Sequence, residues 1–186
     1  MIRKKGRKVP PLSIAKIRAL TTKLRDAFEQ LDVPKGGQLD VLYLLDVALP
    51  QAIPEFSMLI VEDCELGDDL AQTFPDRLQI KVRNSVYEGA ESGNGMDRFT
   101  LAHELGHLFM HRNLSSYARS GKTDERLDEH KVYEDSEWQA DCFAAELLMP
   151  FDEVAKCKNA DEVCKKFGVS MKSAEVRFDK VNKEKK

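Results

Sequence analysis

The chain has 186 residues, of which 42% are hydrophobic and 33% are charged, and its formal net charge is −3. This length suits one domain with its own core, and so mild a negative charge gives no overall argument for a nucleic-acid partner. No apolar stretch is long enough to cross a membrane, and no apolar run follows the basic N-terminus as it would in a signal peptide, so we expect a cytoplasmic protein with no membrane association.

Both ends of the chain are locally basic. Residues 1–11 are rich in lysine and arginine and end in Pro10-Pro11, and residues 181–186 are also lysine-rich. We expect a flexible N-terminal arm and a flexible C-terminal tail, and prefer solvated ends to segments that bind nucleic acid or an acidic partner. The cysteines are not closely spaced, which predicts reduced thiols without a second metal site: Cys64, Cys142, Cys157 and Cys164.

The first predicted element is an amphipathic helix that begins after Ser13, a plausible N-cap. Its apolar residues recur at steps of three and four: Ile14, Ile17, Leu20, Leu24, Phe28 and Leu31. The loop 34–37 should end this helix, and a second short helix is expected over 39–49, terminated by Pro50.

The hydrophobic period then changes to that of strands. Residues 56–61 predict a strongly buried strand, and an acidic loop follows over 62–69. Residues 77–84 alternate apolar and charged side chains, which predicts a half-buried edge strand. An extended peptide could add to such an edge by backbone hydrogen bonds, although a merely solvated strand face is an equally good interpretation.

After a turn-forming region at 89–95, a helix over 97–112 contains His103, Glu104 and His107 in the pattern His-Glu-x-x-His. Residues four apart lie about one turn apart on the same helix face, so both imidazoles can reach one metal ion. Glu104 is offset by one residue, where it can take a proton from a water molecule that the metal activates.

Apolar residues surround this polar triplet, which indicates a mostly buried helix. The alternative is a core helix whose histidines are satisfied by hydrogen bonds alone. Residues 114–134 are polar and lack periodicity, and we expect a mobile loop near the site.

A catalytic zinc site normally has three protein ligands and one open position, so a third ligand must lie downstream. The candidates are His111, His130, Glu134, Glu137 and Asp141. Glu137 and Asp141 lie one turn apart on a predicted helix at 136–149 that ends near Pro150. One of them can bind the metal while the other accepts the free ring N–H of a ligand histidine.

Two motifs together resemble the ImmA/IrrE family of zinc metallo-endopeptidases. They are Arg98-Phe99-Thr100-Leu101-Ala102-His103-Glu104-Leu105-Gly106-His107 and Glu137-x-x-Ala140-Asp141-x-Phe143-Ala144-x-x-Leu147-Leu148-Met149-Pro150. The resemblance covers about residues 77–178. It implies that His103, His107 and Glu137 bind zinc and that Glu104 is the general base. Many members have asparagine where this chain has Asp141, which leaves Asp141 as the partner of a ligand histidine.

Four further residues are candidates for the cleft around the metal. His111 continues the four-residue series, but as a fourth ligand it would close the water position, so a place in the cleft wall is favoured. Arg98, His130 and Tyr133 are candidates for stabilising an oxyanion, and no spacing rule selects among them.

Beyond Pro150, helices are expected over 152–158 and 160–167, with Gly168 as a C-cap, and a last helix should begin at Ser170. The arrangement around Gly168 resembles half of a helix-turn-helix. We prefer packing of these helices against the core to DNA binding, for which Lys172, Arg177 and Lys180 give weak support.

The resulting prediction is an α+β protein with a zincin-like (thermolysin-like) minimal peptidase core. A small twisted sheet, an active-site helix and a glutamate helix would make up a peptidase domain over 12–150. A helical C-terminal cap of the same domain would cover 151–180.

The resemblance implies a zinc-dependent endopeptidase that cuts a transcriptional repressor of helix-turn-helix type, or an antitoxin, and so relieves repression. Zn²⁺ is the expected cofactor, with Mn²⁺ as the alternative. The competing hypothesis is a metal-binding regulatory module that binds a repressor, an antitoxin or DNA without cutting it. Because the ligand set stops at three, a purely structural zinc site is disfavoured.

Overall fold

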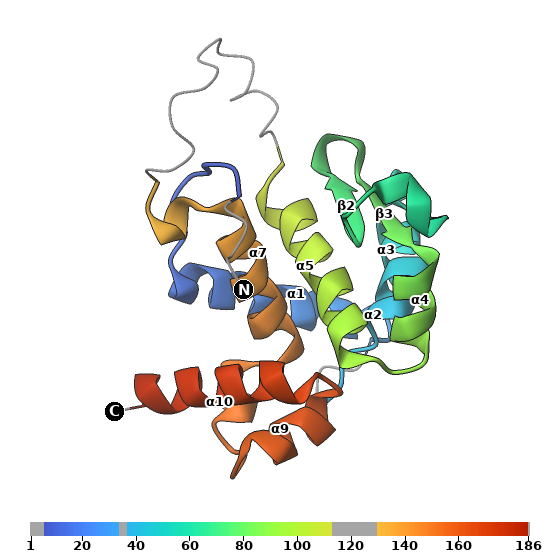
Figure 1. Cartoon of the computed structure of the whole chain (residues 1–186). Coiled ribbons are helices and arrows are strands. Elements are labelled where there is room, and N and C mark those ends of the chain that lie inside the picture. The colour runs from blue at the N-terminus through green and yellow to red at the C-terminus, as the bar shows by residue number, and fades with distance from the viewer. Residues whose placement is uncertain (1–5, 34–36, 113–129, 186) are drawn as a thin grey trace.

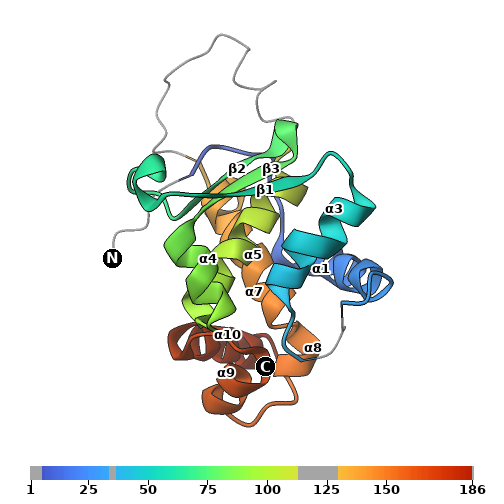
Figure 2. The same cartoon turned by 90° about the vertical axis from the view of Figure 1, so that its right-hand side faces the viewer.

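A computed structural model describes residues 6–33, 37–112 and 130–185. Two helices, α5 (Gly95–Met110) and α7 (Ser136–Leu148), lie side by side at the centre of the molecule, with a small sheet on one side (Figures 1 and 2). The fold is α+β, as predicted, and corresponds to a minimal zincin-like peptidase core. The loop expected over 114–134 lies largely outside the described residues.

Close contact between α5 and α7 requires a glycine at their crossing. A Cβ atom on Gly106 would lie 3.1 Å from the Cα of Ala140 and 3.2 Å from the Cβ of Phe143. Larger side chains here would push the helices apart. Both predicted helices are present within two residues of their expected ends, with Asn94 and Asp135 as N-caps.

The sheet has three strands in the order β1-β3-β2. β1 (Ser57–Val61) runs parallel to β3 (Gln79–Arg83), and β2 (Ala71–Phe74) runs antiparallel to it. The alternating segment does form a strand, but the prediction that it is an edge strand is wrong. It is β3, the central strand, and its side chains Ile80 and Val82 are completely buried. The edge that faces α5 is β2, which the sequence analysis did not predict.

The strand expected to be strongly buried is instead partly exposed. β1 spans nearly the predicted residues, but Leu59 and Ile60 are 41% and 47% exposed. β1 lies at the other edge of the sheet, so only one neighbouring strand covers it. An apolar run therefore indicated a strand correctly but did not reveal its place in the sheet.

The helical run before β1 passes through its proline. α2 (Val41–Tyr43) continues into a π-helical turn, η1 (Leu44–Ala48), and then into α3 (Leu49–Ala52), which contains Pro50. The expected stop at Pro50 is wrong. Pro50 lies in the first turn of α3, where the N–H that proline lacks is not needed.

A further helix, α4 (Asn84–Glu91), extends into the start of the region 89–95 that was expected to be a turn, and a turn follows it before α5 begins at Gly95. Gly89 lies within it, where a Cβ atom would collide with the carboxylate of Asp97. Short 3-10 turns complete the connections: η2 (Asp63–Leu66), η3 (Pro75–Arg77) and η4 (Val132–Glu134).

The N-terminal segment is held against the start of α7 rather than free. Val9 is 4% exposed and its N–H donates to the carbonyl of Glu134 at 2.8 Å. Lys8 forms an antiparallel β-bridge with Asp135. The expectation of a flexible arm is therefore wrong for residues 6–11. It was based on the local positive charge of the segment, which does not show whether the backbone finds hydrogen-bond partners elsewhere in the chain. Ser13 then caps α1 (Ile14–Glu29), as predicted.

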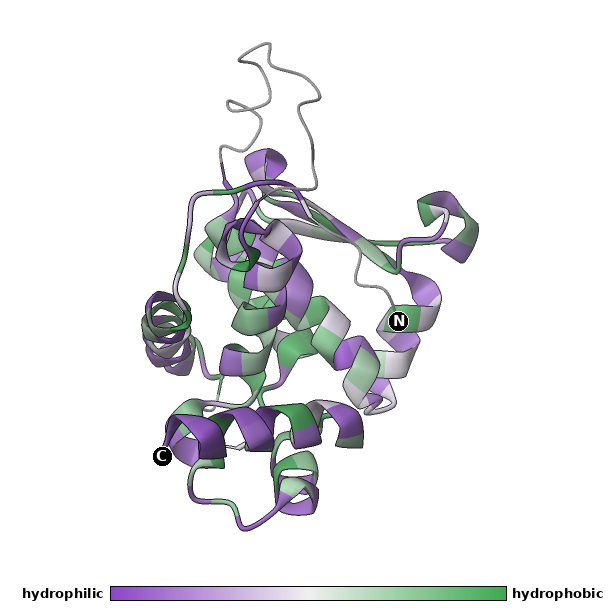
Figure 3. Cartoon of the chain, turned by 60° about the vertical axis from the view of Figure 1, so that its left-hand side comes forward, coloured by the Kyte–Doolittle hydropathy of each residue, from purple (hydrophilic) through white to green (hydrophobic). Residues whose placement is uncertain are grey.

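Three helices form the C-terminal part: α8 (Phe151–Val154), α9 (Ala160–Phe167) and α10 (Met171–Glu184). Figure 3 shows that α10 is largely hydrophilic, yet Val181 is buried. The tail expected from residue 181 is thus helical as far as Glu184. In the residues that the structure describes, no helix is long and apolar enough to cross a membrane.

A buried ion pair joins α10 to α7. Arg177 and Glu146 are 4% and 2% exposed, with two N–H···O contacts of 2.6 and 2.8 Å between them. Arg18 of α1 binds the same carboxylate from its more exposed side. Arg177 is therefore part of the core and does not contribute to a DNA-binding face. The weak support for DNA binding that the sequence analysis took from Arg177 is thus wrong.

We predict that Glu146→Ala lowers the free energy of unfolding by about 3–5 kcal/mol, because it leaves the buried guanidinium of Arg177 without its counter-charge. The matched control is Glu184→Ala, which removes only the exposed partner of Arg18 and should cost under about 1 kcal/mol. Urea unfolding measures both values. Equal, small losses for the two variants would contradict the prediction.

Candidate metal centre

The site is built where the middle of α5 faces the first turn of α7. His103 and His107 lie one turn apart on α5, and Glu137 projects from α7 between them. The Nε2 atoms of the histidines are 3.0 Å apart, and the Glu137 carboxylate lies 3.2 Å from the first and 3.3 Å from the second. One ligand atom from each residue lies within 4.8 Å of the others.

This donor set suits a divalent cation. Two imidazole nitrogens and one carboxylate oxygen converge on one point, which is the usual protein contribution to a catalytic metal site. Burial lowers the pKa of His103, but hydrogen bonds to Asp141 and Glu137 outweigh it and raise the pKa to about 10. The histidines in turn hold the pKa of Glu137 well below its usual range. A cation binding here would compete with the proton that this cluster retains.

Asp141 lies behind His103 rather than beside the converging atoms. Its Oδ1 is 3.0 Å from His103 Nδ1, and its side chain is 50% exposed. Such a contact orients the ring so that Nε2 points toward Glu137. Of Glu137 and Asp141, the two candidates on this helix, the structure thus brings Glu137 to the histidine nitrogens and leaves Asp141 as a partner of His103.

Glu104 faces the sheet, where β2 provides its partner. The hydroxyl of Thr73 lies 2.5 Å from Glu104 Oε2, and Glu104 is 8% exposed. The sequence analysis missed Thr73. No motif marks a lone threonine, and β2 itself was not predicted.

His111 belongs to a buried chain of hydrogen bonds behind His107. Its Nδ1 lies 2.9 Å from His107 Nδ1, and its Nε2 lies 3.1 Å from Gln139 Oε1. Burial, together with the nearby charge of His107, lowers the pKa of His111 to about 4. His111 is therefore a neutral partner of His107, and its ring nitrogens are both used by neighbours rather than directed at the converging atoms.

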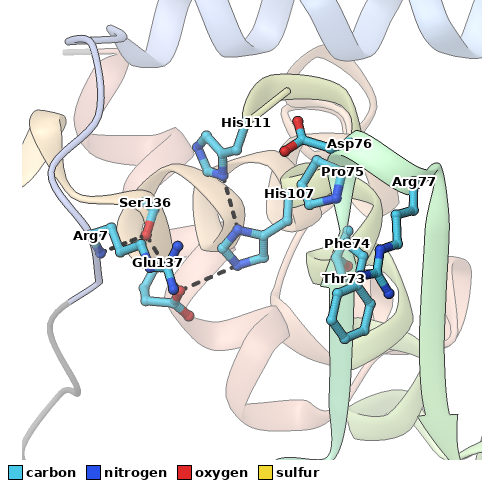
Figure 4. Close-up of a pocket in the computed structure, with 10 residues that line it drawn as sticks. All are labelled: Arg7, Thr73, Phe74, Pro75, Asp76, Arg77, His107, His111, Ser136 and Glu137. Carbon is cyan, nitrogen blue, oxygen red and sulfur yellow. Dashed lines mark hydrogen bonds and ion pairs between the residues drawn. The ribbon is translucent and has the colours of Figure 1, made fainter. Parts of the chain in front are cut away.

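A cleft opens over these residues. Two adjoining cavities of about 350 and 510 Å³ share Arg7 and Glu137 on one side and Thr73 and Phe74 on the other, with His107 between them. Figure 4 shows Arg7 and β2 on opposite sides of His107 and Glu137. The cleft therefore runs between the N-terminal segment and the β2 edge of the sheet.

Of the four residues proposed for the cleft wall, His111 lines one of these cavities and the others do not. Arg98 is 3% exposed and donates to the carbonyls of Leu39, Phe167 and Gly168, so it anchors the C-terminal helices.

His130 and Tyr133 serve the entry to α7. The His130 ring is buried against Asp135 at 2.9 Å, and the Tyr133 carbonyl accepts a hydrogen bond from Gln139. The sequence suggested these residues because they precede Glu137, but that nearness reflects capping of the helix.

We predict that acidification from pH 6.5 to 4.5 destabilises the metal-free protein partly through His111. The unfolded chain takes up a proton on this ring near its ordinary pKa of about 6.5, whereas the folded chain does so near 4, so the unfolded state binds more protons in this window. The contribution is up to about 1.4 kcal/mol per pH unit. Urea unfolding of the wild type and of His111→Asn should show a shallower pH slope for the variant. An NMR titration midpoint of His111 at or above 6.5 would contradict this.

Comparisons with known proteins identify the family of the chain and a similar fold. A search of the curated proteins gives no match. Among solved structures, a Mycobacterium tuberculosis transcriptional regulator is similar, with a TM-score of 0.54 and 16% identity over 85% of this chain. This chain spans about half of that protein, 53% of its length, and at this identity the likeness concerns the fold. The model of the Peptidase_M78 family, described as an IrrE N-terminal-like domain, matches residues 56–179. The chain therefore belongs to the Peptidase_M78 family and contains a metallopeptidase-like domain.

Proposed function

We propose that the protein is a zinc-dependent endopeptidase. The observation that carries this proposal is the convergence of His103, His107 and Glu137 on one point of an open cleft, with Glu104 beside them. Zinc is proposed as the ion because a site of two histidines and one carboxylate is typical of zinc peptidases, and Mn²⁺ is the alternative.

The geometry favours a catalytic site over a structural one. Structural zinc sites are normally closed by four protein ligands, whereas the group found among the described residues has three. Both cavities open onto Glu137 and His107, so a substrate and water can reach the point where the ligands meet. A closed structural site would also not require Glu104, a buried acid beside the ligands that is not itself one of them.

The bound ion would supply Lewis acidity toward the scissile carbonyl and lower the pKa of the attacking water. Glu104 would accept one proton of the attacking water while the water oxygen bonds to the carbonyl carbon. Glu104 would then return this proton to the leaving amine nitrogen as the C–N bond breaks. The Thr73 hydroxyl holds one oxygen of the Glu104 carboxylate, which fixes the direction of the other.

We propose that the substrate is a regulatory protein, either a helix-turn-helix repressor or an antitoxin, in the cytoplasm. Two features support a protein substrate. The β2 edge of the sheet faces the cleft, where an extended peptide can add by backbone hydrogen bonds. The similar solved structure is that of a transcriptional regulator, which is compatible with a role in regulation.

The same structural neighbour favours one competing function. A metal-binding module that recognises a regulatory partner without cutting it would share this fold and this site. It differs from the peptidase in one observable, the integrity of the partner after long incubation.

The first experiment compares metal content in the purified wild type and Glu137→Ala, followed by incubation of the wild type with the repressor-like protein encoded nearest its gene. About one zinc per chain, lost in the variant, and a discrete fragment of the partner support the peptidase. Bound zinc with an intact partner supports the regulatory module. A wild type that binds neither zinc nor manganese would exclude both functions.

We predict that Glu104→Gln keeps its metal and loses cleavage by at least about 100-fold, because the amide fills the same space but cannot accept the proton. The experiment measures both the metal content and the rate of fragment formation for the variant and the wild type. Cleavage at the wild-type rate would exclude Glu104 as the base.

A second pair of variants tests the partner of Glu104. Thr73→Val removes the hydroxyl with little change in volume and should lower kcat about tenfold or more, whereas Thr73→Ser keeps the hydroxyl and should retain most activity. Metal content should stay unchanged in both variants. Equal rates for the valine and serine variants would contradict a role for this hydroxyl.

A further inference from the structure

A buried hydrogen-bond chain behind His107 has no part in the proposed reaction. It links His107 to His111 through their Nδ1 atoms at 2.9 Å, and His111 Nε2 to Gln139 Oε1 at 3.1 Å. The Gln139 amide nitrogen then donates to the carbonyls of Pro10 and Tyr133, at 2.8 Å each. The chain thus begins in the N-terminal segment and ends at a histidine of the candidate metal centre.

The carbonyl end of this chain sets its direction. Carbonyl oxygens only accept hydrogen bonds, so the Gln139 NH₂ group must face Pro10 and Tyr133, and its Oε1 must face His111. That oxygen also only accepts, so His111 carries its proton on Nε2. The Nδ1 atom of His111 is then unprotonated and can only accept a hydrogen bond, so the Nδ1 atom of His107 must be protonated and donate it.

The consequence at the far end is chemical. A neutral imidazole has one proton, so a His107 ring that is protonated at Nδ1 presents a lone pair at Nε2. Nε2 is the atom that lies 3.3 Å from Glu137, at the point where the candidate ligands meet. The opposite direction would place a proton on Nε2 of His107, where it would block a metal ion, and would set two acceptors against each other at Gln139.

Because this hydrogen-bond chain is buried, its direction determines the tautomer of His107. Gln139 is fully buried and His111 is 2% exposed, so water does not replace a mismatched partner, and a lost hydrogen bond leaves a buried polar atom unsatisfied. The other ligand histidine differs, because its partner Asp141 is half exposed.

We propose that Gln139 and His111 are positioning residues that hold His107 in the tautomer whose Nε2 lone pair faces the metal. The inference rests on the proposed metal centre and adds to it a tautomer relay that starts at a backbone carbonyl of the N-terminal segment. Gln139 orients His111, and His111 selects the tautomer of His107.

The first test needs no metal. Long-range ¹H–¹⁵N NMR of the metal-free wild type, at a pH where the rings are neutral, should show His107 protonated at Nδ1 and His111 protonated at Nε2. In Gln139→Met, which lacks the acceptor oxygen, both tautomers of both rings should appear. A wild-type His107 protonated at Nε2 would overturn the proposal.

The second test measures zinc affinity by competition with a chromophoric chelator. His111→Leu should weaken binding about 10–100-fold, because no acceptor remains for the His107 Nδ1–H. His111→Asn should stay within a few-fold of the wild type, because the side-chain oxygen of asparagine can lie close to the position of the ring Nδ1. Equal losses in both variants would reduce His111 to a packing role and overturn the relay.

The outcomes separate this inference from the proposed function. If the wild type binds zinc and cuts its partner while His111→Leu binds zinc as tightly as the wild type, the relay fails and the peptidase stands. If the wild type binds no metal, the proposed function fails, and the NMR result alone then decides whether Gln139 and His111 set the tautomer. Unchanged circular dichroism and thermal unfolding of the variants ensure that a loss of affinity is not a loss of fold.

Discussion

The close approach of α5 and α7 is the constraint on which the rest of the structure depends. Gly106 lets the backbones meet where a Cβ atom would press on Ala140 and Phe143. At this separation the carboxylate of Glu137 reaches both histidines of α5, and Gln139 reaches His111. A wider crossing would separate the candidate ligands, whatever their spacing in the sequence, so the packing of the two helices also assembles the candidate metal centre.

Buried polar groups tie the remaining elements to this helix pair. Arg98 binds carbonyls at the junction of α9 and α10, and Arg177 pairs with Glu146 of α7. Arg25 of α1 donates to the carbonyl of Leu147 at 2.6 Å. Each guanidinium satisfies backbone or carboxylate oxygens that would be costly to bury alone. Side chains whose charge suggests a place in solvent or in the cleft therefore hold the C-terminal helices and α1 in place.

The walls of the cleft are formed by two segments that lie far in the sequence from the His-Glu-x-x-His motif. β2 brings Thr73 to Glu104, and the N-terminal segment brings Arg7 beside Glu137. The same N-terminal segment supplies the Pro10 carbonyl at which the buried chain to His107 begins. The contacts of Glu104 and of His107, and the walls of the cleft, thus all depend on parts of the chain outside α5 and α7.

The sequence by itself determined the helices and the candidate metal ligands that they carry, because both are local. A four-residue spacing on one helix places His103 and His107 on one face wherever that helix lies. Periodicity with caps located α5 and α7 to within two residues and the start of α1 at Ser13, although α1 ends at Glu29, before the loop expected to stop it. Tertiary structure decided what depends on contacts across the chain: the central position of β3, the edge position of β2, the place of the N-terminal segment, and the roles of Arg98 and Arg177 as core anchors. Thr73 and Gln139 acquire their roles only when β2 and α7 are packed against α5, since hydrogen-bond partners are set by distance in space and leave no periodic trace in the sequence.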